Sequence, residues 1–123
     1  ESLAAEILDA SEFETTRNLV LTKPRMQIDV VGVKSDVAIL IDCKHWKRTS
    51  QSALENAVKK QIERTKRFLK TEDVKAVIPA IVTLYQEEAK FIDKVPIIPI
   101  FQLSSFCEEF YGNLDDLNTL EHS

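Results

Sequence analysis

The sequence predicts a single α/β domain built on a mixed β-sheet with helices on both faces. Residues 26–43 are rich in apolar, mostly β-branched residues and are interrupted by Lys34-Ser35, which predicts two consecutive strands joined by a tight turn. Apolar residues recur at helical spacing over residues 54–69, which predicts a long amphipathic helix. The segment Val74–Leu84 is almost entirely apolar, as expected of a strand covered on both faces. A chain of 123 residues is long enough for one domain, 1–123, and too short for two ordinary ones.

The first third of the chain predicts a helix followed by a three-strand meander. Small and apolar residues at helical spacing predict a helix that ends near Ser11. Pro24 separates the first two strands, because proline cannot donate a hydrogen bond to a ladder. The predicted strands are Thr15–Thr22, Met26–Val33 and Asp36–Cys43, with a hairpin turn at Lys34-Ser35.

A loop, Lys47–Gln51, leads into the long helix, for which Ser50 or Ser52 is the candidate N-cap. A stripe of apolar residues and one threonine along this helix is predicted to face the sheet. It consists of Leu54, Ala57, Val58, Ile62, Thr65, Phe68 and Leu69.

The C-terminal half adds further strands and helices after the central strand Val74–Leu84. We predict a short helix at Glu87–Ile92 and a strand at Val95–Phe101, which Pro96 and Pro99 restrict to an edge or a short ladder. A last helix is predicted at Leu103–Tyr111, and the acidic tail Asp115–Ser123 is expected to fray. Strands that follow helices indicate parallel additions to the antiparallel meander.

Composition excludes several classes of protein. Hydrophobic residues make up 44% and charged residues 29%, which is normal for a soluble globular domain. The longest apolar runs are far below the roughly 18 residues of a membrane helix, and no secretory signal is present, so no membrane partner is expected. Cys43 and Cys107 form neither a disulfide framework nor a zinc motif, and Cys43 is expected to be a buried apolar residue.

These features suit a cytoplasmic, intracellular protein. The chain opens directly in a helix, so we expect a fragment of a longer protein.

Charge is unevenly distributed along the chain. The segment 44–70 holds nine bases and two acids, a charge of about +7, although the whole chain carries −4. A solvated helix face explains such a cluster when it stands alone. If a catalytic site lies beside this cluster, the cluster would attract an anionic substrate to that site.

Three charged residues lie inside the apolar strands, where ionised side chains are costly without a partner or a function. They are Asp29, Asp42 and Lys44. Asp42 and Lys44 are two residues apart and project from the same face of their strand. Whether Asp29 joins them depends on the register of the two strands, which the sequence leaves open.

The two aspartates and the backbone carbonyl of Cys43 could together supply three oxygen ligands to Mg²⁺ or Mn²⁺. Such a cation lowers the pKa of a bound water and offsets charge on phosphate. Lys44 would orient or help deprotonate the water, or stabilise charge in the transition state.

These residues resemble the motif of the PD-(D/E)xK nuclease superfamily, an acid on one strand followed by acid-x-lysine on the next. Ile28-Asp29-Val30 is similar to the first half and Asp42-Cys43-Lys44 to the second, although glutamate is commoner than Asp42 at its position. The resemblance implies a restriction endonuclease-like core, αβββαβ plus a further strand and helix. It also implies a Mg²⁺-dependent endonuclease that hydrolyses DNA, of the Mrr type or a type similar to archaeal Holliday junction resolvases.

The resemblance also implies roles for residues outside the two strands. Glu1, with Glu6 as the alternative, corresponds to the glutamate that relatives place on the first helix as a metal ligand. Gln61 corresponds to a glutamine that positions the site from the next helix, although it could equally cap a polar patch on that helix. Many relatives dimerise, so we expect a homodimer or a fused or partner domain for specificity. The basic residues expected to bind nucleic acid are Lys47, Arg48, Lys59, Lys66 and Arg67.

Each candidate also has a simpler explanation. Asp-x-Lys alone is usually a surface pair, His45 is more often a surface residue than a base, and Trp46 more often packs than stacks on a nucleobase. A non-catalytic nucleic-acid-binding or assembly domain that keeps the nuclease fold is the alternative function. A plain structural α/β domain is a third.

Overall fold

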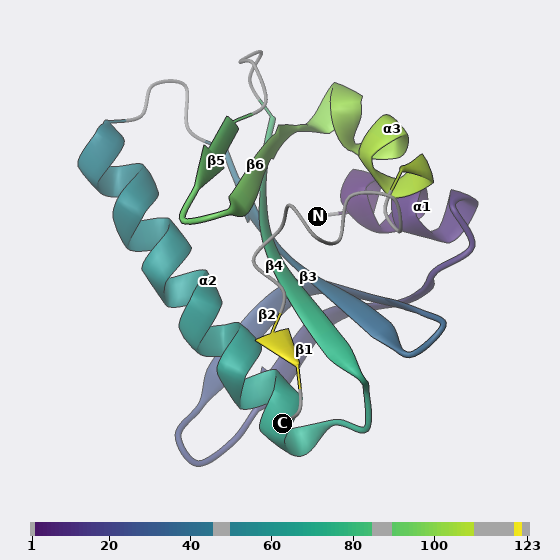
Figure 1. The fold of residues 1–123 in the computed structure, drawn as a ribbon, viewed down its shortest axis with the longest axis vertical. Coiled ribbons are helices and arrows are strands. Elements are labelled where there is room, and N and C mark those ends of the chain that lie inside the picture. The colour runs from purple at the N-terminus through teal and green to yellow at the C-terminus, as the bar shows by residue number, and fades with distance from the viewer. Residues whose placement is uncertain (1, 46–49, 85–89, 110–119, 122–123) are drawn as a thin grey trace.

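The computed structural model describes residues 2–45, 50–84, 90–109 and 120–121. Within these residues, seven strands form one mixed sheet in the order β1-β2-β3-β4-β6-β5, with β7 paired to β4 (Figure 1). The strands are β1 (Glu14–Leu21), β2 (Met26–Lys34), β3 (Val37–Lys44), β4 (Ala76–Thr83), β5 (Lys90–Ile92), β6 (Val95–Pro99) and β7 (Leu120–Glu121). The first three strands form an antiparallel meander, and β4 and β6 add to it in parallel. The predicted α/β class with a mixed sheet is therefore confirmed.

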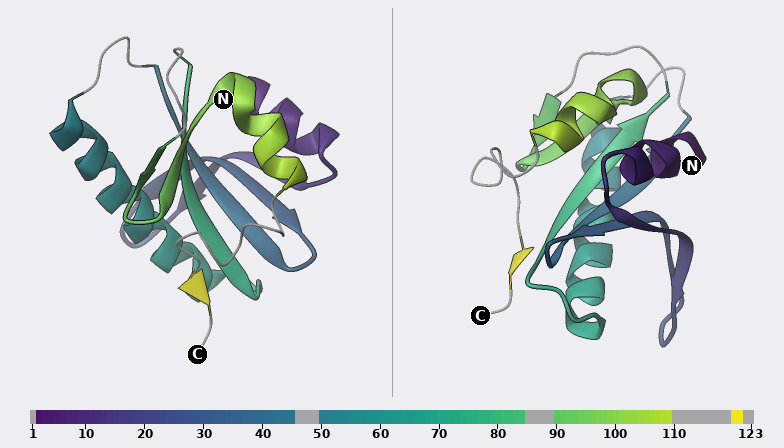
Figure 2. Two further views of the ribbon diagram at one scale, coloured as in Figure 1. Left: turned by 45° about the horizontal axis from the view of Figure 1, so that its top comes forward. Right: turned by 90° about the vertical axis from the view of Figure 1, so that its right-hand side faces the viewer.

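Helices cover both faces of the sheet, as predicted (Figure 2). On one face lie α1 (Ser2–Ala10) and α3 (Leu103–Glu108), which follows the short 3₁₀ helix η1 (Ile100–Gln102). On the other face lies α2 (Gln51–Thr71), which packs on β4 and β3. No helix among the described residues is both long and apolar enough to cross a membrane.

The start and the buried side of α2 follow the sequence pattern. Ser50 is the N-cap, because its hydroxyl accepts a hydrogen bond from the Ala53 N–H at 3.1 Å. The predicted stripe faces the sheet, except that Ile62 is only partly buried and Gln61 joins the buried set. A polar side chain therefore lies within the helix–sheet contact.

The hairpin between β2 and β3 turns one residue later than predicted. Lys34 pairs with Val37, so the two loop residues are Ser35 and Asp36, with φ of 51° and 64°. Two consecutive positive φ values match the twist of the flanking strands in a two-residue hairpin. The predicted turn at Lys34-Ser35 was wrong because pairing of the flanking strands, which local composition does not reveal, sets the turn.

The short helix predicted at Glu87–Ile92 is wrong where the structure describes it. Lys90–Ile92 is instead β5, which pairs antiparallel with β6 through a turn at Asp93 and Lys94, where φ is 50° and 62°. Pairing with a neighbouring strand overrides the weak helical preference of so short a segment. Residues 87–89 lie outside the described residues.

The end of the chain differs from the prediction in two places. β6 ends at Pro99, and residues 100–102 form η1, so the predicted strand to Phe101 was too long. β6 makes a short ladder of three residue pairs with β4, the second of the two arrangements that its prolines allow. Leu120–Glu121 pairs with β4, so the tail does not fray at these residues. The helix α3 ends at Glu108, and residues 110–111 are outside the described part.

Gly32 allows α1 to pack closely on β2. An added Cβ atom would lie 3.0 Å from Leu8 Cδ1 and 3.2 Å from Phe13 Cδ2. Both side chains belong to the core between α1 and the sheet, so they cannot move into solvent. A larger residue would therefore push α1 away from the sheet.

We expect Gly32→Val to lower the free energy of unfolding by about 2 kcal/mol because it overpacks this contact. Urea denaturation would measure the effect. Thr16→Val, at an exposed position of β1 that opens on a hollow, is the control and should change stability by less than about 0.5 kcal/mol. Equal stability of Gly32→Val and wild type would show that the packing is looser than described.

Candidate functional site

The strand register places Asp29 and Asp42 opposite each other. The β2–β3 pairs run from Lys34–Val37 to Val30–Ile41, and the next position along this register is Asp29 opposite Asp42. Residues that face each other in an antiparallel pair share a side of the sheet. This side also carries Leu40, which packs against α2. Asp42 therefore lies on the side of the sheet that faces α2, and Asp29 comes directly after the last pair of the ladder, beside the same end of β3.

The ladder opens at Asp29, and its side chain replaces the missing contact. The β2–β3 pairs end before Asp29, and the β1–β2 pairs omit Asn18, the residue facing Asp29, whose φ is 53°. The Cys43 N–H instead donates a hydrogen bond to Asp29 Oδ2 at 2.9 Å. The carboxylate thus satisfies a backbone donor and is held in place between β2 and β3.

Asp42 is a buried carboxylate between two cations. The residue is 7% exposed. Its Oδ2 lies 3.2 Å from Lys44 Nζ and 3.9 Å from Arg64 Nη1. Burial raises the pKa of Asp42, and the charges of Lys44 and Arg64 oppose that rise. Within the described residues the contacts of Oδ2 are these two cations, and no backbone N–H or neutral side chain donates to it.

Gln61 links α2 to β3 and β4 near the acids. Its side chain is fully buried, and Nε2 donates to the Leu40 carbonyl at 2.8 Å and to the Ala80 carbonyl at 3.3 Å. Its Oε1 accepts from Arg64 Nη1 at 3.1 Å, which orients the guanidinium near Asp42. Gln61 therefore connects the backbones of two neighbouring strands to a charged group of the site.

Sequence reasoning missed two residues of this region. Arg64 was counted as part of the basic segment without a role, although its spacing of three from Gln61 places both on one helix face. Thr83 pairs with Lys44 and so shares its side of the sheet. Thr83 is 5% exposed, and its hydroxyl has no hydrogen-bond partner among the described residues. Its only signal in the sequence is a polar residue at the end of an apolar strand.

The residues present fit a hard divalent cation. Asp42 Oδ2 is a buried acceptor to which no neutral group donates, and Asp29 lies at the end of the neighbouring β2 ladder. The N–H and C=O of one strand residue face the same neighbour in an antiparallel pair, so the Cys43 carbonyl also faces β2. Two carboxylates and a carbonyl are ligands that Mg²⁺ accepts while it keeps water. The described residues bring no third His, Cys, Asp or Glu to the site.

The two glutamates of the first helix remain apart from this set. Glu1 lies outside the described residues. Glu6 is exposed on α1, whose buried residues pack on the opposite face of the sheet from α2. The described part of the chain therefore does not bring Glu6 to Asp42.

The residues predicted to bind nucleic acid have different surroundings. Lys47, Arg48 and also Trp46 lie outside the described residues, while Lys59 and His45 are exposed. The exposed Lys66 forms an ion pair with Glu63 at 3.6 Å. Arg67 is held within the molecule, because its guanidinium donates to the carbonyls of Thr22 and Pro24, each at 3.0 Å. Arg67 thus has a structural role at the β1–β2 turn.

Cys43 and Cys107 are both free thiols within the described residues. Cys43 is partly buried and packs against the core on the α1 side, so its expected burial is found only in part. Burial raises the pKa of both the Cys43 and the Cys107 thiol to about 11, so both remain protonated at neutral pH.

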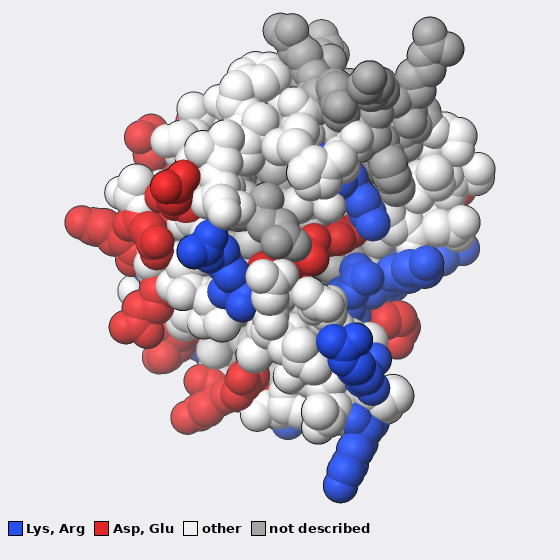
Figure 3. Space-filling view, turned by 180° about the vertical axis from the view of Figure 1, so that it is seen from behind, with Lys and Arg blue, Asp and Glu red and all other residues white. Residues whose placement is uncertain are grey.

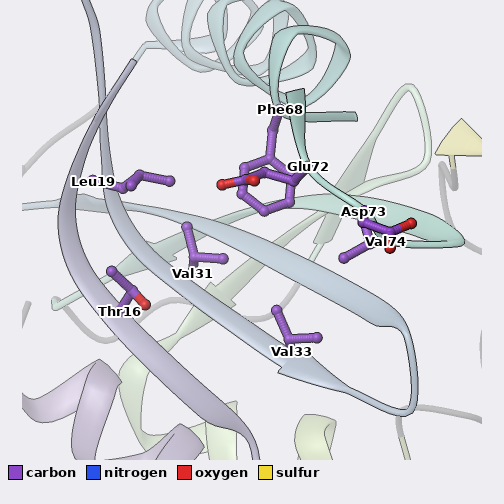
Figure 4. Close-up of a pocket in the computed structure, with 8 residues that line it drawn as sticks. All are labelled: Thr16, Leu19, Val31, Val33, Phe68, Glu72, Asp73 and Val74. Atoms are coloured by element: carbon purple, nitrogen blue, oxygen red, sulfur yellow. The ribbon is translucent and has the colours of Figure 1, made fainter. Parts of the chain in front are cut away.

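Basic and acidic side chains are separated on the face of the molecule that is turned away from the viewer in Figure 1. Lysine and arginine side chains gather along one side of this view, and acidic side chains gather mainly along the other (Figure 3). One hollow between α2 and β2, of about 450 Å³, is lined chiefly by basic residues. A second, of about 230 Å³, lies nearer the end of α2, where Val31, Val33 and Phe68 meet the acids Glu72 and Asp73 (Figure 4). The basic hollow includes Arg64 and so adjoins the carboxylates.

Comparison with known proteins gives only distant likenesses. No family model matches the chain, and no curated protein matches it. The chain is similar to AF1548, a protein of unknown function, with 25% identity and a TM-score of 0.46 over 70% of this chain and 47% of that protein. It is also similar to VC1899 from Vibrio cholerae, with 14% identity and a TM-score of 0.51 over 94% of this chain and 32% of that protein. The chain spans less than half of either protein, and the likeness to VC1899 concerns the fold alone.

We expect Gln61→Ala to lower the free energy of unfolding by about 3 kcal/mol, because it opens a cavity and removes two buried hydrogen bonds. Gln61→Met keeps the volume and loses only the polar contacts, so its cost should be smaller. Thermal and urea denaturation would compare the two variants. A cost below about 1 kcal/mol for Gln61→Ala would contradict the tethering role.

The raised pKa of Asp42 leads to a second expectation, measured in EDTA. A carboxyl whose folded pKa exceeds its ordinary value of 3.8 destabilises the fold when ionised. This destabilisation is present above the raised pKa and disappears as pH falls through it to below 3.8. Asp42→Asn should therefore raise the melting temperature at pH 7, and the gain should shrink towards acid pH. The exposed Asp73→Asn is the control; a lower melting temperature for Asp42→Asn at pH 7 would oppose this interpretation.

Proposed function

We propose that this chain is a divalent-cation-dependent endonuclease domain that hydrolyses DNA phosphodiester bonds. The observation that carries the proposal is the gathering of Asp29, Asp42 and Lys44 where the β2–β3 ladder ends, with Lys44 Nζ 3.2 Å from Asp42 Oδ2 and Asp29 Oδ2 bonded to the Cys43 N–H. Buried charges without a structural need are frequent at functional sites, because they lower stability and persist only for another reason. Asp42 is such a charge, since its environment disfavours ionisation.

In this proposal Asp29, Asp42 and the Cys43 carbonyl hold Mg²⁺ or Mn²⁺. The bound cation supplies a water of lowered pKa and stabilises charge on the phosphate. Asp29 has one oxygen already fixed by the Cys43 N–H, which reduces the motion lost on binding. Lys44 neutralises Asp42 in the free protein. With the substrate bound, its ammonium would lie beside the scissile phosphate and orient the attacking water or stabilise the transition state.

The arrangement of elements supports the same class of protein. A helix, a three-strand meander, a helix and a parallel fourth strand follow one another along this chain. The PD-(D/E)xK nucleases, which the strand motif resembles, have this order in a restriction endonuclease-like core. We therefore assign the domain to that superfamily as part of the proposal. Specificity would come from DNA structure, from a second copy of the chain or from a fused or partner domain.

The alternative is a nucleic-acid-binding or assembly domain without catalysis. The absence of a third carboxylate from the described residues favours it. The intact pair of aspartates with Lys44 argues against it, because a binding module has no need for two acids beside its anionic ligand. The two functions differ in the dependence of cleavage on metal and on Lys44.

We expect the protein to cut DNA with Mg²⁺ or Mn²⁺ and to lose the activity in EDTA. A panel of labelled single strand, duplex, flap, four-way junction and methylated duplex would reveal its preferred structure. Lys44→Ala should lower the rate by about 100-fold or more, because it removes a group that acts on the water or the transition state. Lys75→Ala, at an exposed lysine directly before β4, is the matched control and should cut like wild type.

The variant Asp29→Asn tests whether cleavage needs the negative charge of Asp29. An asparagine oxygen still accepts the Cys43 N–H, so the strand contact survives while the negative charge is lost. We expect this variant to fold normally and to lose metal-dependent cleavage. Undiminished cleavage by Lys44→Ala and Asp29→Asn, or no divalent-dependent cleavage of any DNA in the panel, would refute the proposed function.

A further inference from the structure

A basic groove runs between the middle of α2 and the beginning of β2. We use this name for the hollow of about 450 Å³ lined by Arg25, Met26, Gln27, Lys59, Lys60, Glu63 and Arg64. Met26 and Gln27 begin β2, and Arg25 directly precedes them. The other four residues follow the helix at spacings of three and four, so they lie on adjoining faces of α2. The groove is therefore built by two elements that the sheet holds in fixed relation.

The charge of the basic groove is not balanced from within the molecule. Its lining holds four cations and one acid, although the chain as a whole carries −4. The one acid, Glu63, is itself paired with Lys66 at 3.6 Å. Among the described residues, Arg25, Lys59 and Lys60 have no ion-pair partner, and Arg64 is 3.9 Å from Asp42. Close cations without counter-charges repel one another, and a bound anion would relieve this repulsion.

The basic groove adjoins the proposed catalytic face. Arg64 belongs to the groove and also lies beside Asp42. Gln27 belongs to the groove and precedes Asp29 by two residues on β2. Two residues of strand span about 7 Å. One strand of a duplex advances about 3.4 Å per phosphate, so this span corresponds to about two nucleotides.

The groove suits a sugar–phosphate chain better than a small free anion. Met26 is half-buried, and the stems of the lysines and arginines add apolar surface on which sugars can pack. The cationic ends can meet phosphates at more than one point along the groove. A single small anion would contact only some of the cations that line the basic groove.

We propose that the basic groove binds the DNA backbone beside the scissile phosphate and positions it over Asp29, Asp42 and Lys44. This inference rests on the proposed function, which it extends by adding Arg25, Lys60 and Arg64 to the residues that contact substrate. The basic groove fixes the position of the DNA strand. The two acids and Lys44 act on the phosphodiester bond that is cut. Binding in the groove needs no divalent cation, because its contacts are with phosphates and sugars only.

DNA binding in EDTA tests the groove separately from catalysis. Fluorescence anisotropy would follow a labelled duplex with wild type, with the groove variant Lys59→Gln/Lys60→Gln, and with the control Lys75→Gln/Lys90→Gln. The control removes the same charge from exposed lysines outside the groove. We expect the groove variant to bind about tenfold more weakly at low salt, and the slope of log K against log [salt] to fall by about 1.8. The control should stay within about twofold of wild type. Arg25→Gln, on the opposite wall, should weaken binding in the same direction.

The outcomes separate the two proposals. Equal losses of affinity in the groove variant and the control would overturn the proposal that the basic groove binds DNA. A wild-type protein that binds no duplex would also overturn it. Groove-dependent binding without any metal-dependent cleavage would support the groove and reject the endonuclease. Cleavage that requires Lys44 but is unchanged in all groove variants would support the endonuclease and reject the groove. Thermal denaturation of each variant would establish that it is folded before binding is compared.

Discussion

The register between β2 and β3 is the constraint on which the candidate site depends. Pairing Val30 with Ile41 brings Asp29 level with Asp42, and the hydrogen bond from the Cys43 N–H to Asp29 Oδ2 holds the strands where the ladder ends. A slip of one residue would turn Asp42 and Lys44 to the α1 side relative to Asp29. The two-residue turn at Ser35 and Asp36, with its two positive φ values, selects the observed register.

Charge inside the sheet is tolerated because α2 supplies partners for it. Gln61 fastens the helix to the backbones of β3 and β4, and this contact holds Arg64 near Asp42. Lys44 completes the cluster from the same strand as the acid. The net environment still raises the pKa of Asp42, so the site is less stable than an apolar one would be. A cation bound beside Asp42 would recover part of this stability.

Sequence patterns predicted those parts of the fold in which local chemistry and tertiary packing agree. The long helix carries a helical period, the first strands are rich in β-branched residues, and β4 is an apolar run of strand length, and packing in the sheet agrees with each of these signals. Lys90–Ile92 carries no such pattern, and its pairing with β6 decided its structure. Asp29, Asp42, Lys44 and Gln61 stood out because polar residues among apolar ones are rare. Arg64 and Thr83 did not, because a basic residue on a helix and a threonine at a strand end are ordinary.

The sequence by itself determined which side chains are available for chemistry and which face of its own strand or helix each occupies, because these follow from the periods of the backbone. Only the tertiary structure decided which of them meet. It set Asp29 opposite Asp42, brought Arg64 from α2 to the same carboxylate, joined Arg25 to Lys59 and Lys60 in one groove, and assigned Arg67 to the β1–β2 turn. These contacts join residues far apart in the chain, and they depend on register and helix docking, which local sequence does not encode.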